Sequence, residues 1–153
     1  MKNVVILGST GSIGKSTIEV IEANKDDFFI AGLVAKSNEK LLTEQAEKFN
    51  VKNVCLTDQT SKNEKFISES KMEDLIVGDQ VDIVVAAISG VVGLKTILKA
   101  VKAGKRVLIA NKEPLVAAGE ILMREAEKYN SEIIPIDSEP VSYTHLRAHE
   151  TRI

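Results

Sequence analysis

The sequence predicts an α/β fold, with a doubly wound, mainly parallel β-sheet and helices on both of its faces. Short apolar runs of about four to eight residues alternate with segments in which apolar residues recur at the helical period. Parallel strands need a crossover between them, which a helix usually provides. With 153 residues, 44% of them hydrophobic and 27% charged, the chain is long enough for one domain with a substantial core.

Six apolar runs are the predicted strands. They have the length of buried strands and fall short of the roughly 20 apolar residues that a membrane span needs. The runs are Asn3–Leu7, Phe28–Ala35, Asn53–Leu56, Val81–Ala87, Arg106–Ala110 and Glu132–Ile136.

Helices are predicted between these strands, each with one apolar face. The faces consist of Ile13, Thr17, Ile18 and Ile21; of Leu42, Ala46 and Phe49; of Leu94, Ile97, Leu98 and Val101; and of Leu115, Ala118, Leu122, Ala126 and Tyr129. Pro114 suits the first position of the last helix, where a backbone N–H needs no helical partner. The polar stretch 58–71 is predicted to be a solvated loop and helix.

The composition favours a small-molecule ligand. Twenty Lys and Arg against 22 Asp and Glu give a net charge of −2, and no basic stripe indicates a nucleic-acid partner. No apolar run suits a membrane span or a signal peptide, so we expect a cytoplasmic protein. The single cysteine, Cys55, lies in an apolar run and is predicted to be a buried thiol that forms no disulfide within the chain.

A glycine-rich segment, GSTGSIGKST at residues 8–17, follows the first strand and opens the first helix. This position predicts a phosphate site at a helix N-terminus. The ending Gly14-Lys15-Ser16 imitates a P-loop, but the P-loop spacing requires a glycine where Ser9 stands. A nucleoside triphosphatase is disfavoured by this register, although the apolar strand that leads into Asp137 leaves it open.

The alternative is a dinucleotide loop. Gly8, Gly11 and Gly14 form a GxxGxxG variant of the loop found in Rossmann-like folds, where glycines permit a tight turn, close approach of the pyrophosphate and packing of helix against strand. After the second strand come Lys36, Ser37 and Asn38, which offer a cation and hydrogen-bond donors and no carboxylate. This favours NADP over NAD, because a carboxylate here would repel the 2′-phosphate.

Polar residues also follow the last two strands. Asn111, Lys112 and Glu113 stand at a helix start, where a cation is mildly unfavourable unless it meets a ligand anion. After the sixth strand, Asp137 and Glu139 project to the same side if the chain stays extended, and their oxygens suit Mg²⁺ or Mn²⁺. In a doubly wound sheet these strand ends share the ligand-binding edge.

Three motifs together closely resemble the 1-deoxy-D-xylulose 5-phosphate reductoisomerase family over about residues 1–139: GSTGSIG at 8–14, ANKE at 110–113 and PIDSE at 135–139. The resemblance implies an enzyme of the methylerythritol phosphate route to isoprenoids. Such an enzyme rearranges a ketose phosphate and reduces the resulting aldehyde with NADPH to 2-C-methyl-D-erythritol 4-phosphate. It also implies a divalent cation, Mg²⁺ or Mn²⁺, and a homodimer for the full-length family.

The resemblance also implies roles for individual residues. Lys36 and Ser37 depart from the Gly-Lys/Arg-Asn that the family commonly has there, and Pro114 departs from a serine. The implied cofactor contacts are Gly8, Thr10, Gly11, Ser12, Ile13, Gly14, Lys36, Ser37, Asn38, Asn111 and Glu113; the implied substrate contacts are Lys112 and Ser138; and the implied metal ligands are Asp137 and Glu139.

The resemblance ends after Glu139. Residues 140–153 show neither helical nor strand period and are predicted to be a frayed or non-native tail, in which His145 and His149 form no metal site. The family's catalytic and C-terminal domains are absent from this sequence, so we expect weak NADPH binding and no reductoisomerase activity. A non-catalytic NADP-binding sensor and another NADP-dependent dehydrogenase are the alternatives, but a sensor has no use for Lys112 or for the two carboxylates.

Overall fold

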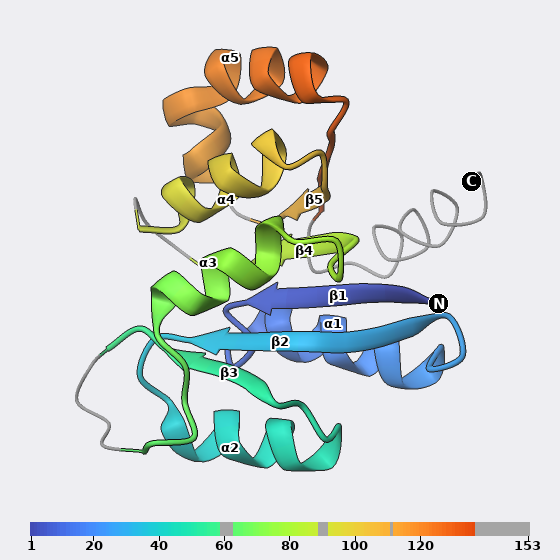
Figure 1. Cartoon of the computed structure of the whole chain (residues 1–153), viewed down its shortest axis with the longest axis vertical. Helices are drawn as coiled ribbons and strands as arrows, with labels where there is room; N and C mark the ends of the chain where they lie inside the picture. The colour runs from blue at the N-terminus through green and yellow to red at the C-terminus, as the bar shows by residue number, and fades with distance from the viewer. Residues whose placement is uncertain (59–62, 89–91, 111, 137–153) are drawn as a thin grey trace.

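The computed structural model describes residues 1–58, 63–88, 92–110 and 112–136, and for residues 92 and 112–117 only the backbone. Its strands form one six-stranded sheet in the order β3-β2-β1-β4-β5-β6, and every neighbouring pair is parallel. This is the order of a doubly wound dinucleotide-binding fold, in which the chain reverses its direction of travel between β1 and β4. The predicted fold class is confirmed (Figure 1).

The strands lie where the apolar runs predict them. Their bounds are β1 Lys2–Leu7, β2 Phe28–Ala35, β3 Asn53–Leu56, β4 Ile83–Ala86, β5 Arg106–Ile109 and β6 Glu132–Pro135. Predicted ends that overshoot, such as Val81 and Ala87 around β4, lie where ladder pairing with the neighbouring strands stops. The two longest strands, β1 and β2, are neighbours in the sheet and pair along the whole of β1.

The helices connect successive strands. They are α1 Ser12–Ala23, α2 Glu39–Lys48, α3 Glu69–Val77, α4 Val92–Lys102 and α5 Lys112–Tyr129. Two expectations for α5 are wrong. The helix begins at Lys112 instead of Pro114, and Tyr129, which was predicted to lie on the apolar face of the helix, is 40% exposed. Pro114 fits the third position because first-turn N–H groups have no helical acceptor in any case. Tyr129 is the last residue of α5, and its ring lies 5.3 Å from the ammonium of Lys128.

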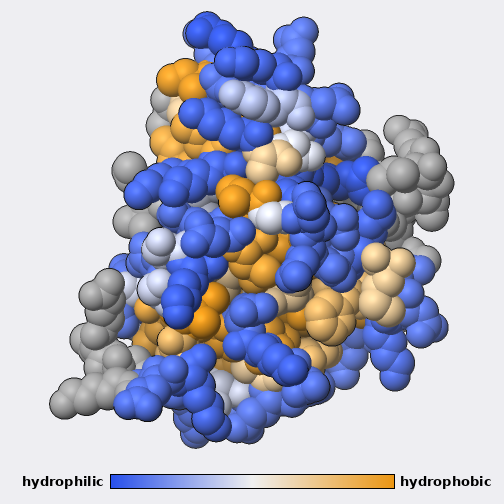
Figure 2. All heavy atoms as spheres, in the orientation of Figure 1, coloured by the Kyte–Doolittle hydropathy of each residue, from blue (hydrophilic) through white to orange (hydrophobic). Residues whose placement is uncertain are grey.

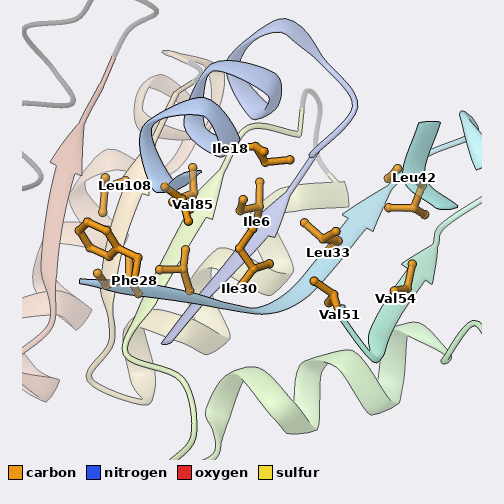
Figure 3. Close-up of a cluster of buried hydrophobic side chains, with 14 of the residues drawn as sticks. Ile6, Ile18, Phe28, Ile30, Leu33, Leu42, Val51, Val54, Val85 and Leu108 are labelled. Carbon is orange, nitrogen blue, oxygen red and sulfur yellow. The ribbon is translucent and has the colours of Figure 1, made fainter. Parts of the chain in front are cut away.

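The core has two layers, one on each face of the sheet. Alternate residues of β1 point to opposite sides, so that Val4 and Ile6 join the cluster under α1 and α2, while Val5 and Leu7 join the cluster under α3, α4 and α5. Figure 3 shows the first cluster, where Ile18 of α1 and Leu42 of α2 lie over the strands. Both faces of the central strands are therefore apolar, as helix-covered parallel strands require.

Helix α3 is short and leaves the beginning of β2 uncovered. Phe29 is 48% exposed, and with Ala31 of β2 and Leu75 of α3 it lines part of an open hollow of about 430 Å³. Figure 2 shows a mainly hydrophilic face on which hydrophobic residues gather near the middle, over this part of the sheet. Within the described ranges, no helix is both long and apolar enough to cross a membrane.

Cys55 is a buried thiol, as predicted. Its side chain belongs to β3 and packs in the cluster under α3, and the residue is only 1% exposed. Burial raises the pKa of Cys55 from 9.0 to about 11, and the carboxylate of Glu69 adds to the rise. The thiol is therefore neutral at physiological pH and a poor nucleophile.

This raised pKa predicts a loss of stability in alkali. The unfolded chain releases the Cys55 proton near pH 9.0, whereas the folded chain holds it until about 11. The contribution of Cys55 to the free energy of unfolding is thus constant below pH 9 and falls as the pH rises from about 9 to about 11. Urea unfolding at several pH values should show a steeper alkaline loss for the wild type than for Cys55→Ala. Parallel profiles for the two proteins would contradict the prediction.

Candidate functional site

Backbone hydrogen bonds join the strand ends at the carboxyl edge of the sheet. The carbonyl of Val34, in β2, accepts the N–H groups of Gly8 at 2.7 Å and Ser9 at 3.0 Å, and Leu7, at the end of β1, accepts from Ala87 at 2.8 Å. Further along the edge, Ala110 N–H donates to Ala86 at 3.0 Å and Ile136 N–H donates to Ile109 at 2.9 Å. The segments after β1, β2, β4, β5 and β6 therefore start side by side.

The glycines of the loop permit contacts that a side chain would prevent. A Cβ on Gly14 would lie 2.2 Å from the carbonyl oxygen of Gly8 and 2.6 Å from Cα of Ser9. Gly8 has a φ of +89°, and a Cβ there would lie 2.7 Å from the carbonyl oxygen of Ala87, after β4. By contrast, a Cβ on Gly11 would meet its nearest atom, the Gly8 oxygen, at 3.7 Å. Gly14 thus seats α1 on the loop, and Gly8 brings the loop against the end of β4.

Helix α1 begins directly after this loop, at Ser12. Its N-cap is Gly11, which supplies no side-chain hydrogen bond, and its first turn carries no acidic residue. Helices α2 and α3 are instead capped by Asn38 and Ser68, and each has a glutamate in its first turn. The positive end of the α1 dipole therefore lacks the compensation that the other two have, which suits an anionic ligand. Lys15 is exposed, as expected for a solvated first-turn residue.

The turn after β2 is held in place next to this loop. Lys36, Ser37 and Asn38 are all exposed. The carbonyl of Lys36 accepts the N–H of Asp58 at 2.7 Å, and Asn38 Oδ1 caps α2 by accepting the N–H of Leu41 at 3.2 Å. This cap uses only the amide oxygen of Asn38, so its amide nitrogen is still a potential donor, and Lys36 is exposed to solvent. The turn therefore presents donors beside the loop.

The remaining candidate residues lie outside the described residues, or have only their backbone described. Asn111, Asp137, Ser138 and Glu139 lie outside the described residues, and so does the segment 140–153 with His145 and His149. Lys112 and Glu113 open α5, of which only the backbone is described there. Their strands nevertheless end at the same edge as the glycine loop. Among the described side chains, no group of three or more His, Cys, Asp and Glu residues could hold a metal ion.

Sequence reasoning missed one polar residue of the site. Gln45 of α2 is 8% exposed, and its Nε2 donates to the carbonyl of Ser9 at 2.9 Å. Ser9, the second residue of the loop, is itself fully buried. The available signal was a polar residue on an apolar helix face, since Gln45 follows Leu42 by three positions and precedes Phe49 by four.

A larger hollow lies at the opposite edge, where the strands begin. It has a volume of about 610 Å³ and is lined by charges of both signs, among them Lys105, Arg106, Asp79 and Asp82. Ligands of doubly wound sheets bind at the carboxyl ends of the strands, so the segments around the glycine loop are the better candidate site.

The glycine contacts predict different effects of two similar substitutions. Gly14→Ala forces a Cβ into the Gly8 carbonyl and should lower the free energy of unfolding by about 3 kcal/mol or more. Gly11→Ala has room for its Cβ, and its cost should stay near 1 kcal/mol, because alanine is a poor N-cap. Urea denaturation of the two variants and the wild type measures both values. Equal destabilisation would contradict this assignment of the two glycines.

Comparisons with known proteins point to one family. The family model for 1-deoxy-D-xylulose 5-phosphate reductoisomerase matches residues 4–119. A curated relative, the reductoisomerase of Ruthia magnifica subsp. Calyptogena magnifica, is 41% identical over 149 residues, which covers 91% of this chain and 39% of the relative. That of Actinobacillus pleuropneumoniae serotype 5b is 43% identical over 152 residues, covering 91% and 38%.

Solved structures agree. The Zymomonas mobilis reductoisomerase in complex with NADPH superposes with a TM-score of 0.81 at 33% identity, over 90% of this chain and 39% of that one. The chain thus spans about two fifths of the length of the proteins that it matches. Since the family model covers most of the described sheet, from β1 into α5, the chain belongs to the 1-deoxy-D-xylulose 5-phosphate reductoisomerase family.

Proposed function

We propose that residues 1–139 form the NADPH-binding domain of a cytoplasmic 1-deoxy-D-xylulose 5-phosphate reductoisomerase. The observation that carries this proposal is the cradle at the switch between β1 and β4, where Gly8 and Gly14 leave no room for side chains and α1 presents an uncapped N-terminus. First-turn N–H groups and a positive dipole end match the charge of a pyrophosphate. The matched Zymomonas mobilis structure is a complex with NADPH.

The turn after β2 supports NADPH over NADH. A 2′-phosphate there would meet the Lys36 ammonium, the Ser37 hydroxyl and the free amide of Asn38, all of which are exposed. The turn lies beside the loop because Val34, two residues before Lys36, accepts both loop N–H groups. We assign Thr10, Gly11, Ser12 and Ile13 to the pyrophosphate, and Asn111 and Glu113 to further cofactor contacts.

The proposed chemistry takes place at the same edge. NADPH supplies the hydride when it is bound, and a divalent cation polarises the substrate oxygens. We propose that Lys112 and Ser138 bind the substrate, 1-deoxy-D-xylulose 5-phosphate, and that the carboxylates of Asp137 and Glu139 bind the cation. Support comes from the position of these residues directly after β5 and β6, and from a family member solved in complex with magnesium. We extend the proposal to a homodimer of the full-length enzyme with no nucleic-acid partner.

Lys36 provides the test of cofactor choice. Lys36→Met should raise the Kd for NADPH by roughly tenfold and leave the Kd for NADH unchanged, because only NADPH carries the 2′-phosphate. Fluorescence titration of the purified chain measures both constants. Lys52→Met, which removes an exposed lysine just before β3 at the opposite edge of the sheet, is the matched control and should change neither. An equal loss for NADPH and NADH would exclude a 2′-phosphate contact by Lys36.

Turnover separates binding from catalysis. We expect the 153-residue chain to bind NADPH weakly and to show no oxidation of NADPH when 1-deoxy-D-xylulose 5-phosphate and Mg²⁺ are added. Two carboxylates without a complete ligand shell hold Mg²⁺ poorly. Loss of NADPH absorbance is the measurement, with a full-length family enzyme as the positive control. Measurable turnover by the chain alone would refute the expectation.

A further inference from the structure

Gln45 holds the second residue of the glycine loop from below. It lies on the buried face of α2, next to the fully buried Leu42, and its Nε2 donates to the carbonyl oxygen of Ser9 at 2.9 Å. The N–H of the same residue, Ser9, donates to Val34 at 3.0 Å. Both backbone polar groups of Ser9 are therefore bonded to elements that underlie the loop.

This arrangement determines where the next N–H points. In a trans peptide the carbonyl of one residue and the N–H of the following residue point in opposite directions. Because Gln45 draws the Ser9 carbonyl toward the buried side, the N–H of Thr10 points away from the core. No described residue accepts a backbone hydrogen bond from Thr10. Helix α1, whose N-terminus has no side-chain cap, begins two residues after Thr10.

The environment of Gln45 is not one that stability alone would select. Its Oε1 and the Oγ of Ser9 are both buried and have no hydrogen-bond partner among the described residues. A buried polar atom without a partner destabilises a fold, and an apolar side chain of similar shape avoids that cost. Methionine is such a side chain, since it matches glutamine in length and lacks the donor.

We propose that Gln45 is a positioning residue for the cofactor: by holding the Ser9 carbonyl inward, it directs the Thr10 N–H toward the pyrophosphate of a bound dinucleotide. The proposal rests on the proposed function for its ligand. It links α2, which follows the turn that we assign to the 2′-phosphate, to the loop that we assign to the pyrophosphate. Glutamate cannot replace glutamine here, because its carboxylate would place an acceptor against the Ser9 carbonyl.

Two ligands separate positioning from a purely structural role. Gln45→Met and Gln45→Glu should each raise the Kd for NADPH about tenfold, equivalent to about 1.4 kcal/mol. Both should leave the Kd for adenosine 2′-monophosphate within about twofold of the wild type, because that probe lacks the pyrophosphate. Glu47→Met, at an exposed position of the same helix, is the matched control and should change neither constant. An unchanged Kd for NADPH, or an equal loss for both ligands, would overturn the proposal.

A measurement without ligand tests the same residue independently. The NMR order parameter of the Thr10 N–H should fall in Gln45→Met from about 0.85, typical of rigid backbone, toward about 0.6, while strand β1 stays rigid. An unchanged value would overturn the proposal whether or not NADPH binds. If the wild-type chain fails to bind NADPH while Thr10 loosens in Gln45→Met, the proposed function fails and the role of Gln45 in ordering the loop stands.

Discussion

The contact between helix α1 and the glycine loop is the constraint on which the site depends. At Gly14 the helix approaches the loop so closely that a Cβ would lie 2.2 Å from the Gly8 oxygen. This approach fixes the start of α1 directly above the end of β1, at the point where the sheet order reverses. Gly8 makes a second close approach, to the segment after β4. The cradle that we assign to the pyrophosphate therefore results from backbone packing, which requires positions without a side chain at Gly8 and Gly14.

Helix α2 supports the loop through polar contacts instead. Asn38 caps the start of the helix and Gln45, two turns later, holds Ser9. Val34 adds the shared acceptor for two loop N–H groups. Since the same helix begins at the turn that we assign to the 2′-phosphate, the segments that we propose for the two anionic parts of the cofactor are in direct contact. A substitution that displaces α2 would therefore alter both the glycine loop and the turn after β2.

Most of the fold could be predicted from the sequence because the apolar runs and the helical faces are unambiguous. The runs 28–35 and 53–56 match β2 and β3 residue for residue. The start of α5 was wrong by two residues, since a proline is tolerated anywhere in a first turn and does not mark one position. Gln45 was missed because the local pattern marks it only as a polar residue on an apolar helix face, and its partner, Ser9, is 36 residues away in the sequence. The burial of Cys55 was predicted correctly, because the thiol lies within a short apolar strand whose neighbouring side chains are also buried.

The seating of Gly14 on Gly8 also sets the length of the segment between them. Deleting one residue from this segment would restore the glycine spacing of a triphosphate-binding loop in front of Gly14-Lys15-Ser16. The deletion would also shift Gly14 out of register with the Gly8 carbonyl and bring a residue with a Cβ into the contact. The dinucleotide loop and the triphosphate-binding loop thus differ by a single deletion in sequence. In structure, a change from one to the other would require α1 to be repacked on the sheet. Loop length, more than the presence of a lysine, separates them.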